Sequence, residues 1–263
     1  MKKVIDAKDL KYRELNSSIR LALGQSHFSD KRVDGRIELT LNNVLGHRYI
    51  GDGLKKDHLI NIMGVPGNDL AAFMDGPTIE VFDNGQDGIG NTMNAGKVII
   101  HGGVGDITGY SMRGGEIYIE KNVGFRCGIH MKSYKEKIPA IVIGGSAGNF
   151  LGEYMAGGII VVLGLYCQEL THFPYSGTRQ LVGDHIGTGM HGGIIYIRDD
   201  VAGYKLGKEV KKARVDKEDE KILNKYIGNY CKYFDMDKGL IKAEQFIKLI
   251  PFSHRPYGRL YTY

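Results

Sequence analysis

The sequence contains no tryptophan, only six prolines and only three cysteines among 263 residues. Cys127, Cys167 and Cys231 lie far apart and form no CxxC pair, which argues against disulfides, an iron–sulfur cluster and a cysteine-rich zinc site in this chain. There is no apolar run of about 18 residues that could cross a bilayer, and there is no signal peptide. These absences predict a cytoplasmic protein with no membrane segment.

Motifs for catalysis are absent as well. There is no GxSxG, HExxH or HxH pattern, and because the chain starts with Met1 we expect no amidotransferase nucleophile at an N-terminal cysteine. Glycine-rich stretches at 85–90 and 103–109 resemble phosphate-binding loops, but another glycine turn and a strand pattern follow where a dinucleotide fingerprint needs a helix. We therefore predict no catalytic residue, no cofactor-binding residue and no metal ligand in this chain.

The net charge of +5 is modest and unevenly placed. Residues 204–263 hold 14 Lys and Arg against 8 Asp and Glu, so the first 203 residues are close to neutral. A basic tail can bind nucleic acid or a partner surface. Acidic residues at 218–220 interrupt this one, which favours a solvated helix or a protein partner over nucleic acid.

Glycine is abundant, with 38 residues, which is roughly twice the usual share of ~7%. The methionines show why, because four of them recur at intervals of 19 residues and two more keep the phase after insertions of 5 and 16 residues. These six are Met74, Met93, Met112, Met131, Met155 and Met190. Around them the chain repeats the pattern G-x-x-x-G-x-x-M-x-G-G-x-[IV]-x-[IV], which predicts one short strand between glycine turns in each repeat.

Nineteen residues are too few for a strand and a helix with two turns, but they suit one coil of a solenoid. The predicted fold is therefore all-β, a parallel β-helix of about six or seven coils, right-handed because parallel crossovers almost always are. We expect the six methionines to form one interior column. The position four residues before each methionine is mostly apolar and should also point inward, which makes Cys127 a buried apolar residue rather than a reactive thiol.

The position six residues before each methionine is mostly Asp or Asn, residues whose side chains bond nearby backbone in turns. We interpret this column as a ladder of turns rather than a row of metal or anion ligands. Its members are Asn68, Asp87, Asp106, Phe125, Asn149 and Asp184.

The open ends of a solenoid must be covered, and the flanking sequences suit that role. We expect an N-terminal helical cap over residues 1–35, with the helix at 7–23. The repeat domain would occupy residues 36–203. Residues 204–263 would form a charged helical segment at 207–234 and an extended C-terminal arm laid on a surface.

Charged and aromatic residues near the central methionines form the candidate surface for a subunit partner or a channel. Same-phase residues stack on one face of a regular solenoid, and both Arg113 with Lys132 and Tyr110 with Glu153 share a phase. A solvated polar edge is the alternative interpretation. The candidate residues are Tyr110, Arg113, Arg126, His130, Lys132 and Glu153, together with Arg255 and Tyr257 of the C-terminal arm.

Several long stretches identify a family. The runs GNTMNAGKVIIHGGVGDITGYSMRGGEIYI, GFRCGIHMK and GNFLGEYMAGGIIVVLG resemble the glycine-repeat (GXGXG) C-terminal domain of the glutamate synthase large subunit. The likeness covers roughly residues 35–200, and YRELNSSIR and RPYGRLY resemble the segments that flank this domain in split forms of the enzyme. The family's domain is a right-handed β-helix without catalytic residues.

The resemblance implies a non-catalytic structural subunit. Glutamate synthase makes two glutamates from glutamine and 2-oxoglutarate, and the resemblance implies amidotransferase and FMN-domain chains as partners, with FMN and an iron–sulfur cluster on a partner and none on this chain. The C subunit of formylmethanofuran dehydrogenase carries similar repeats and is the alternative. A third interpretation is a free-standing scaffold or binding protein, and self-association also stays open.

Overall fold

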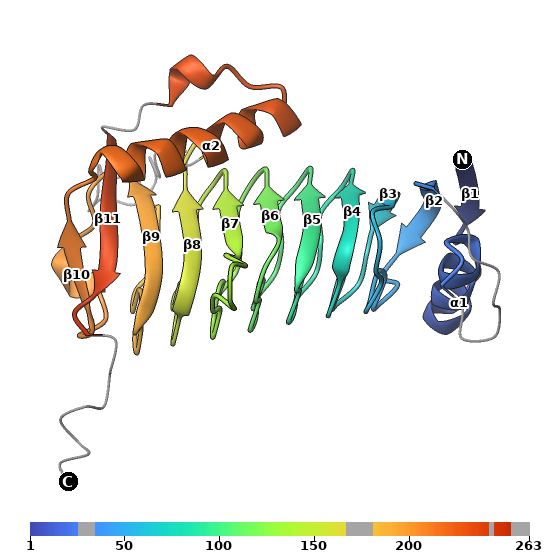
Figure 1. The fold of residues 1–263 in the computed structure, drawn as a ribbon, viewed down its shortest axis with the longest axis horizontal. Coiled ribbons are helices and arrows are strands. Elements are labelled where there is room, and N and C mark those ends of the chain that lie inside the picture. The colour runs from blue at the N-terminus through green and yellow to red at the C-terminus, as the bar shows by residue number, and fades with distance from the viewer. Residues whose placement is uncertain (26–34, 167–180, 242–244, 254–263) are drawn as a thin grey trace, which may run out of the picture.

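The computed structural model describes residues 1–25, 35–166, 181–241 and 245–253. Eleven strands form one sheet in the order β1-β2-β3-β4-β5-β6-β7-β8-β9-β11-β10 (Figure 1). The strands are β1 (Lys2–Asp6), β2 (Glu38–Leu45), β3 (Leu59–Val65), β4 (Asp75–Val81), β5 (Ala95–Ile100), β6 (Glu116–Ile119), β7 (Ala140–Ile143), β8 (Ala156–Val162), β9 (Gly192–Arg198), β10 (Val210–Ala213) and β11 (Phe246–Pro251). The helices are α1 (Tyr12–Ala22) and α2 (Lys217–Tyr233), with short 3-10 turns η1 (Gly203–Lys205) and η2 (Lys238–Leu240).

The parallel β-solenoid predicted from the methionine period is confirmed. Strands β1 to β9 pair in parallel with their sequence neighbours, and one turn of the coil separates each strand from the next. The six methionine-phased turns lead into β4 to β9 in register, so that Ile79, Val98, Ile117, Ile141, Ile160 and Ile195 follow one another across the sheet. Figure 1 shows the strands side by side along the long axis of the molecule.

The solenoid interior is filled by stacked apolar columns. All six methionines of the repeat are fully buried, as are Leu70, Ile89, Leu151 and Ile186 four residues before their methionines. Cys127 belongs to that column, and burial raises the pKa of its thiol to about 12. A thiol held in its neutral form is a poor nucleophile, so Cys127 acts here as a small apolar residue.

The turn before each methionine has an unusual and regular backbone. Residues one, three and five positions before the methionine have left-handed φ values in all six turns, for example Arg126, Gly128 and His130 at 56°, 74° and 54°. Left-handed backbone costs a non-glycine residue ~1 kcal/mol or more. The backbone hydrogen bonds between coils offset that cost, because the amides of Arg126 and His130 donate to Asn149 and Glu153 in the next coil at 2.9 Å.

The Asp and Asn column forms the predicted ladder, and its hydrogen bonds run between coils. Four of the six side chains accept a backbone N–H from the residue of the same phase in the next coil, as Asp87 does from Asp106 at 2.8 Å and Asp106 from Phe125 at 2.7 Å. Asn68 and Asn149 do the same for Asp87 and Asp184. Phe125 interrupts the ladder, because its side chain has no acceptor.

The chain ends differ from the expectation. The expected helix at 7–23 is shorter, Tyr12–Ala22, and residues 2–6 before it are a strand that extends the sheet beside β2. At the other end, residues 246–251 of the predicted arm are extended but are not laid on a surface, and residues 254–263 lie outside the described residues. Instead β11 is inserted into the sheet, antiparallel to both β9 and β10. Because β11 completes the backbone bonding of β9, this arrangement closes the parallel stack with a reversed strand.

A second, smaller core lies outside the solenoid under α2. This helix runs across the strands at the C-terminal half of the sheet (Figure 1). It buries Leu223, Ile227 and Tyr230 against outward-facing residues of β6 to β9, including Tyr118 and Tyr196. Asp216 caps its first turn, accepting the amides of residues 218 and 219 at 2.9 and 3.0 Å. The helix was expected within residues 207–234, but the first part of that segment is β10.

Candidate functional site

Four of the residues predicted for a partner or channel surface line one groove on the turn side of the solenoid. Tyr110, Arg113, His130 and Lys132 surround a volume of about 410 Å³. We call this the cationic groove. Its full lining is Tyr110, Ser111, Arg113, His130, Lys132, Tyr154, Ala156 and His191.

The backbone of the repeat sets the position of the charged side chains in the groove. The residue after each methionine donates its N–H to the methionine carbonyl of the preceding coil, as Arg113 does to Met93 at 2.8 Å and Lys132 to Met112 at 3.0 Å. Ala156 and His191 make the same bond in the next two coils, at 2.8 and 2.9 Å. Four successive coils therefore place Arg113, Lys132, Ala156 and His191 in one column, with a rung spacing of ~4.8 Å.

Aromatic rings form the other wall of the groove. The His130 ring stacks on the Tyr154 ring, with centroids 5.3 Å apart and planes 10° apart, and the Tyr110 ring meets His130 edge-on at 6.0 Å. The absence of a side chain at Gly189 leaves space for the Tyr154 ring. A Cβ at position 189 would lie 2.3 Å from the Tyr154 ring, and its backbone is left-handed at φ 71°.

Arg126 and Glu153, two further predicted residues, do not line the groove. The Arg126 Nε donates to the nearly buried Glu153 carboxylate at 2.9 Å, and the Arg126 guanidinium lies over the Phe150 ring at 4.7 Å. This pair holds two adjacent coils together and neutralises both charges. Arg255 and Tyr257 lie outside the described residues, so the structure does not place them.

The groove keeps an excess of positive charge. Within the described ranges, neither Arg113 nor Lys132 forms an ion pair. The Nε of Arg113 is buried and has no hydrogen-bond partner there. That nitrogen is out of reach of a molecule in the groove, so an acceptor from outside the chain would bond the terminal nitrogens of this partly exposed side chain.

Four lining residues were not among the predicted ones, namely Ser111, Tyr154, Ala156 and His191, and the phase could have identified the two aromatic ones. Tyr154 stands one residue before its methionine, like His130, and His191 stands one residue after, like Arg113 and Lys132. The insertions of 5 and 16 residues separate these pairs along the chain. Applying the phase rule past both insertions gives the complete column.

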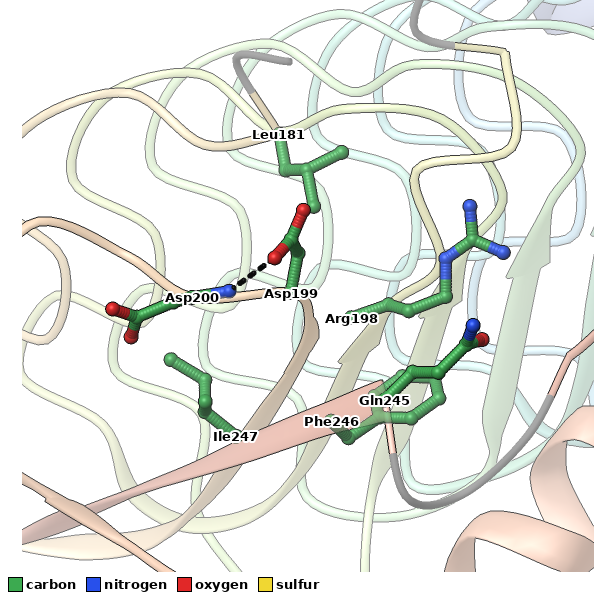
Figure 2. A pocket seen from close by; sticks show the side chains of 7 residues that line it. All are labelled: Leu181, Arg198, Asp199, Asp200, Gln245, Phe246 and Ile247. Carbon is green, nitrogen blue, oxygen red and sulfur yellow. Dashed lines mark hydrogen bonds between the residues drawn. The ribbon is translucent and has the colours of Figure 1, made fainter. Parts of the chain in front are cut away.

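Two other hollows on the surface contain ion pairs or charge-bearing hydrogen bonds within the chain. The first, of about 540 Å³, lies beside β11 and is lined by Leu181, Arg198, Asp199, Asp200, Gln245, Phe246 and Ile247 (Figure 2). There Asp200 pairs with Lys212 at 2.5 Å, and Arg198 donates to the Gly164 carbonyl at 3.4 Å. The second, of about 620 Å³, contains the Lys225–Glu116 ion pair at 3.3 Å and the Arg36–Asp57 pair at 3.5 Å.

The described residues contain no cluster of three or more His, Cys, Asp or Glu side chains that could hold a metal ion. Cys127 and Cys231 are buried, and burial raises the pKa of both thiols. Among the helices that the structure describes, none combines the length and apolar character needed to span a membrane. The cationic groove, which contains two cations that form no ion pair among the described residues, is therefore the candidate binding surface.

Comparison with known proteins assigns the chain to a family. The GXGXG motif model matches residues 24–251. The uncharacterised protein MJ1350 of Methanocaldococcus jannaschii is 44% identical over 263 residues, covering 98% of this chain and 96% of that protein. The ferredoxin-dependent glutamate synthase 2 of Synechocystis sp. is 28% identical over 64% of this chain, and the NADPH glutamate synthase large chain of Bacillus subtilis is 24% identical over 91% of it.

The alignments differ in how much of each relative they cover. The chain spans 10% of the Synechocystis enzyme and 17% of the Bacillus subtilis large chain, so it corresponds to one section of these proteins. In this chain the matched residues include the solenoid, and glycine occupies several of its left-handed turn positions, such as Gly90, Gly109 and Gly128. The chain belongs to the GXGXG motif family and is homologous to the C-terminal region of the glutamate synthase large chain.

Proposed function

We propose that this chain is a non-catalytic structural subunit of a glutamate synthase-type complex. It would hold an amidotransferase chain and an FMN-containing synthase chain in fixed relative positions, with FMN and the iron–sulfur cluster on the partner. The observation that carries the proposal is the combination of two matches. The chain aligns with one section of large glutamate synthases, yet it also aligns with 96% of the length of MJ1350, so the domain occurs in a protein of its own.

The character of the interior supports a scaffold role. The coil interior is packed with fully buried methionine and β-branched side chains. Each coil also bonds to its neighbours through both the parallel strands and the left-handed turns. A solenoid joined along two sides in this way is a stiff spacer, which is what fixed positioning of two partner chains requires.

The turn side of the central coils supports a docking role. Phe125 is 52% exposed and Tyr110 is 38% exposed. Phe125 directly precedes Arg126 in the chain, and Tyr110 lines the cationic groove. Exposed aromatic residues and arginine are enriched where proteins meet and often contribute most of the binding energy. Phe125 stands where most other coils have Asp or Asn, and although its ring packs against Gly148, about half of the residue stays exposed, so we assign it to a partner contact.

A native pull-down of the tagged chain from its own cells tests the proposal. Recovery of flavin absorbance with an FMN-containing synthase chain and an amidotransferase chain, identified by mass spectrometry, is the expected result. The double variant Phe125→Ala with Tyr110→Ala should lose most of the recovered flavin. Tyr204→Ala is the matched control, because Tyr204 is 82% exposed at the far end of the molecule, and it should recover flavin like the unmodified chain.

Two other outcomes would overturn the proposal. Recovery of a tungsten- or molybdenum-containing partner would indicate a formylmethanofuran dehydrogenase-type complex. A single band without flavin would indicate a free-standing solenoid.

A further inference from the structure

The cationic groove holds two positive charges that the fold does not use. Arg113 and Lys132 follow their methionines in adjacent coils, and neither has an acidic partner in the described part of the chain. The two carboxylates bonded to residues beside the groove are occupied. Glu153 accepts Arg126 at 2.9 Å, and Glu209 accepts the Gly189 amide at 3.0 Å.

The guanidinium of Arg113 is placed for an oxyanion. Its Nε is buried without an acceptor, although the side chain as a whole lies at the groove surface. A guanidinium presents a planar set of donors that matches the two oxygens of a carboxylate or phosphate. Lys132, one rung of ~4.8 Å away, adds a point charge to the same side of the groove.

The size and walls of the groove suit a small molecule. Its volume of about 410 Å³ lies within the ~300–1,000 Å³ range of small-ligand sites. Ala156 stands between Lys132 and His191 in the column, and its short side chain leaves the space that a longer residue would fill. The Tyr110 and Tyr154 side chains add aromatic rings and hydroxyls to the lining.

We propose that the cationic groove is a binding site for a small organic anion that presents a carboxylate or phosphate group to Arg113 and Lys132. The site is formed by this chain alone. The proposal therefore stands whether or not the chain joins a glutamate synthase-type complex, and binding can be measured on the purified chain without any partner.

Isothermal titration calorimetry of the purified chain at low salt tests the proposal, with succinate, inorganic phosphate and neutral succinamide as probes. One anion should bind with a 1:1 stoichiometry and a Kd of about 1 mM or tighter, and succinamide should not bind. The stronger of the two anions distinguishes a carboxylate site from a phosphate site. Binding should weaken as NaCl is raised, because salt screens the two cations.

Matched variants locate the site. Arg113→Gln and Lys132→Gln should each raise the Kd at least about tenfold, since each removes one charged contact. Ala156→Leu should abolish binding without changing any charge, because the added side chain fills the groove. Lys121→Gln removes an exposed cation outside the groove and should bind like the unmodified chain. Circular dichroism confirms that each variant is folded.

Three results would overturn the proposal. These are no saturable binding of either anion, binding that all the groove variants retain, and binding of a glutamate-rich peptide with no binding of the small anions. The last result would assign the groove to an acidic segment of a partner chain.

Discussion

Lys248 of β11 donates a hydrogen bond to the buried carboxylate of Asp219 in α2, with 2.8 Å between Nζ and Oδ2. Asp219 also accepts the Tyr196 hydroxyl of β9 at 2.6 Å and the Asp216 amide at 2.9 Å. One carboxylate thus joins the inserted strand, the last parallel strand and the covering helix. The C-terminal segments are fastened to the solenoid by this buried network as well as by apolar packing.

Removing Lys248 should destabilise the protein strongly. Lys248→Met leaves the Asp219 carboxylate buried without its charged partner, which costs ~3–5 kcal/mol in comparable pairs. Lys212→Met is the matched control, because Lys212 pairs with an Asp200 side chain that is 73% exposed, and such surface pairs contribute ~0–1 kcal/mol. Urea unfolding of the two variants measures both values. Equal losses would show that Asp219 does not depend on its partner.

The same network predicts an acid-sensitive stability. Burial alone would raise the pKa of Asp219, but hydrogen bonds from Lys248 and Tyr196 outweigh it and hold the pKa below its usual value. A group with a lowered folded pKa adds stability that is complete above its unfolded pKa of ~3.9 and is lost as pH falls below that value. Asp219→Asn should therefore flatten the decline of the melting temperature below about pH 4. An unchanged decline would contradict this assignment.

Met112 tests the interior of the repeat. Met112→Asp places a charge in a fully buried apolar column and should cost more than about 4 kcal/mol. Met112→Leu keeps the volume and should cost less than about 1.5 kcal/mol. As a control outside the core, Met63→Asp should have little effect, since Met63 is 40% exposed. Thermal unfolding followed by circular dichroism distinguishes these variants, and near-normal stability of Met112→Asp would be inconsistent with the buried column.

Thr108 offers a change that should stabilise the protein. It occupies the buried column of Leu, Ile and Cys residues, and its hydroxyl has no hydrogen-bond partner among the described residues. Thr108→Val removes the unsatisfied hydroxyl with no loss of volume and should add ~1 kcal/mol to the free energy of unfolding. Thr188→Val serves as the control, because the Thr188 hydroxyl donates to His185 at 3.0 Å, and it should be neutral or destabilising. A loss of stability in Thr108→Val would mean that the hydroxyl is satisfied.

Gly109 tests the left-handed turns. Its φ is 73°, and a Cβ there would lie 2.4 Å from the Cδ1 of Ile141 inside the core. Gly109→Ala should therefore cost at least ~2 kcal/mol from backbone strain and overpacking together. Gly203→Ala has open space and should be close to neutral. Chemical unfolding of both variants gives the comparison, and equal stability would mean that the turn tolerates a side chain.

The repeat was predictable because its signal is local and periodic. The 19-residue spacing of the methionines gave the coil, the buried columns and the Asp and Asn ladder, and each depends only on residues within one or two coils. The same phase also brought Arg113 and Lys132 together. Within the groove, Tyr154 and His191 were not predicted, although the phase was followed past the five-residue insertion to Glu153, because phase alone does not show which side chains enclose one hollow.

The ends were less predictable because they lie outside the period. The five residues of β1 pair in the sheet with β2, about 36 positions further along the chain, and β11 pairs with β9 some 50 positions before it. The sequence of neither segment indicates which strand edge it will pair with. The pairing partner of each end strand is determined by which strand edges of the folded solenoid are unpaired. That is a property of the whole molecule and cannot be predicted from a short segment.

Successive coils are stacked with their turns and strands in register, so each coil has the same position and orientation relative to the coil before it. The domain is therefore modular. Deleting or duplicating one 19-residue unit would shorten or lengthen it by a single rung of ~4.8 Å and leave both ends intact. Evolution could adjust the distance between two attached bodies in steps of that size, so the coil number works as a molecular ruler.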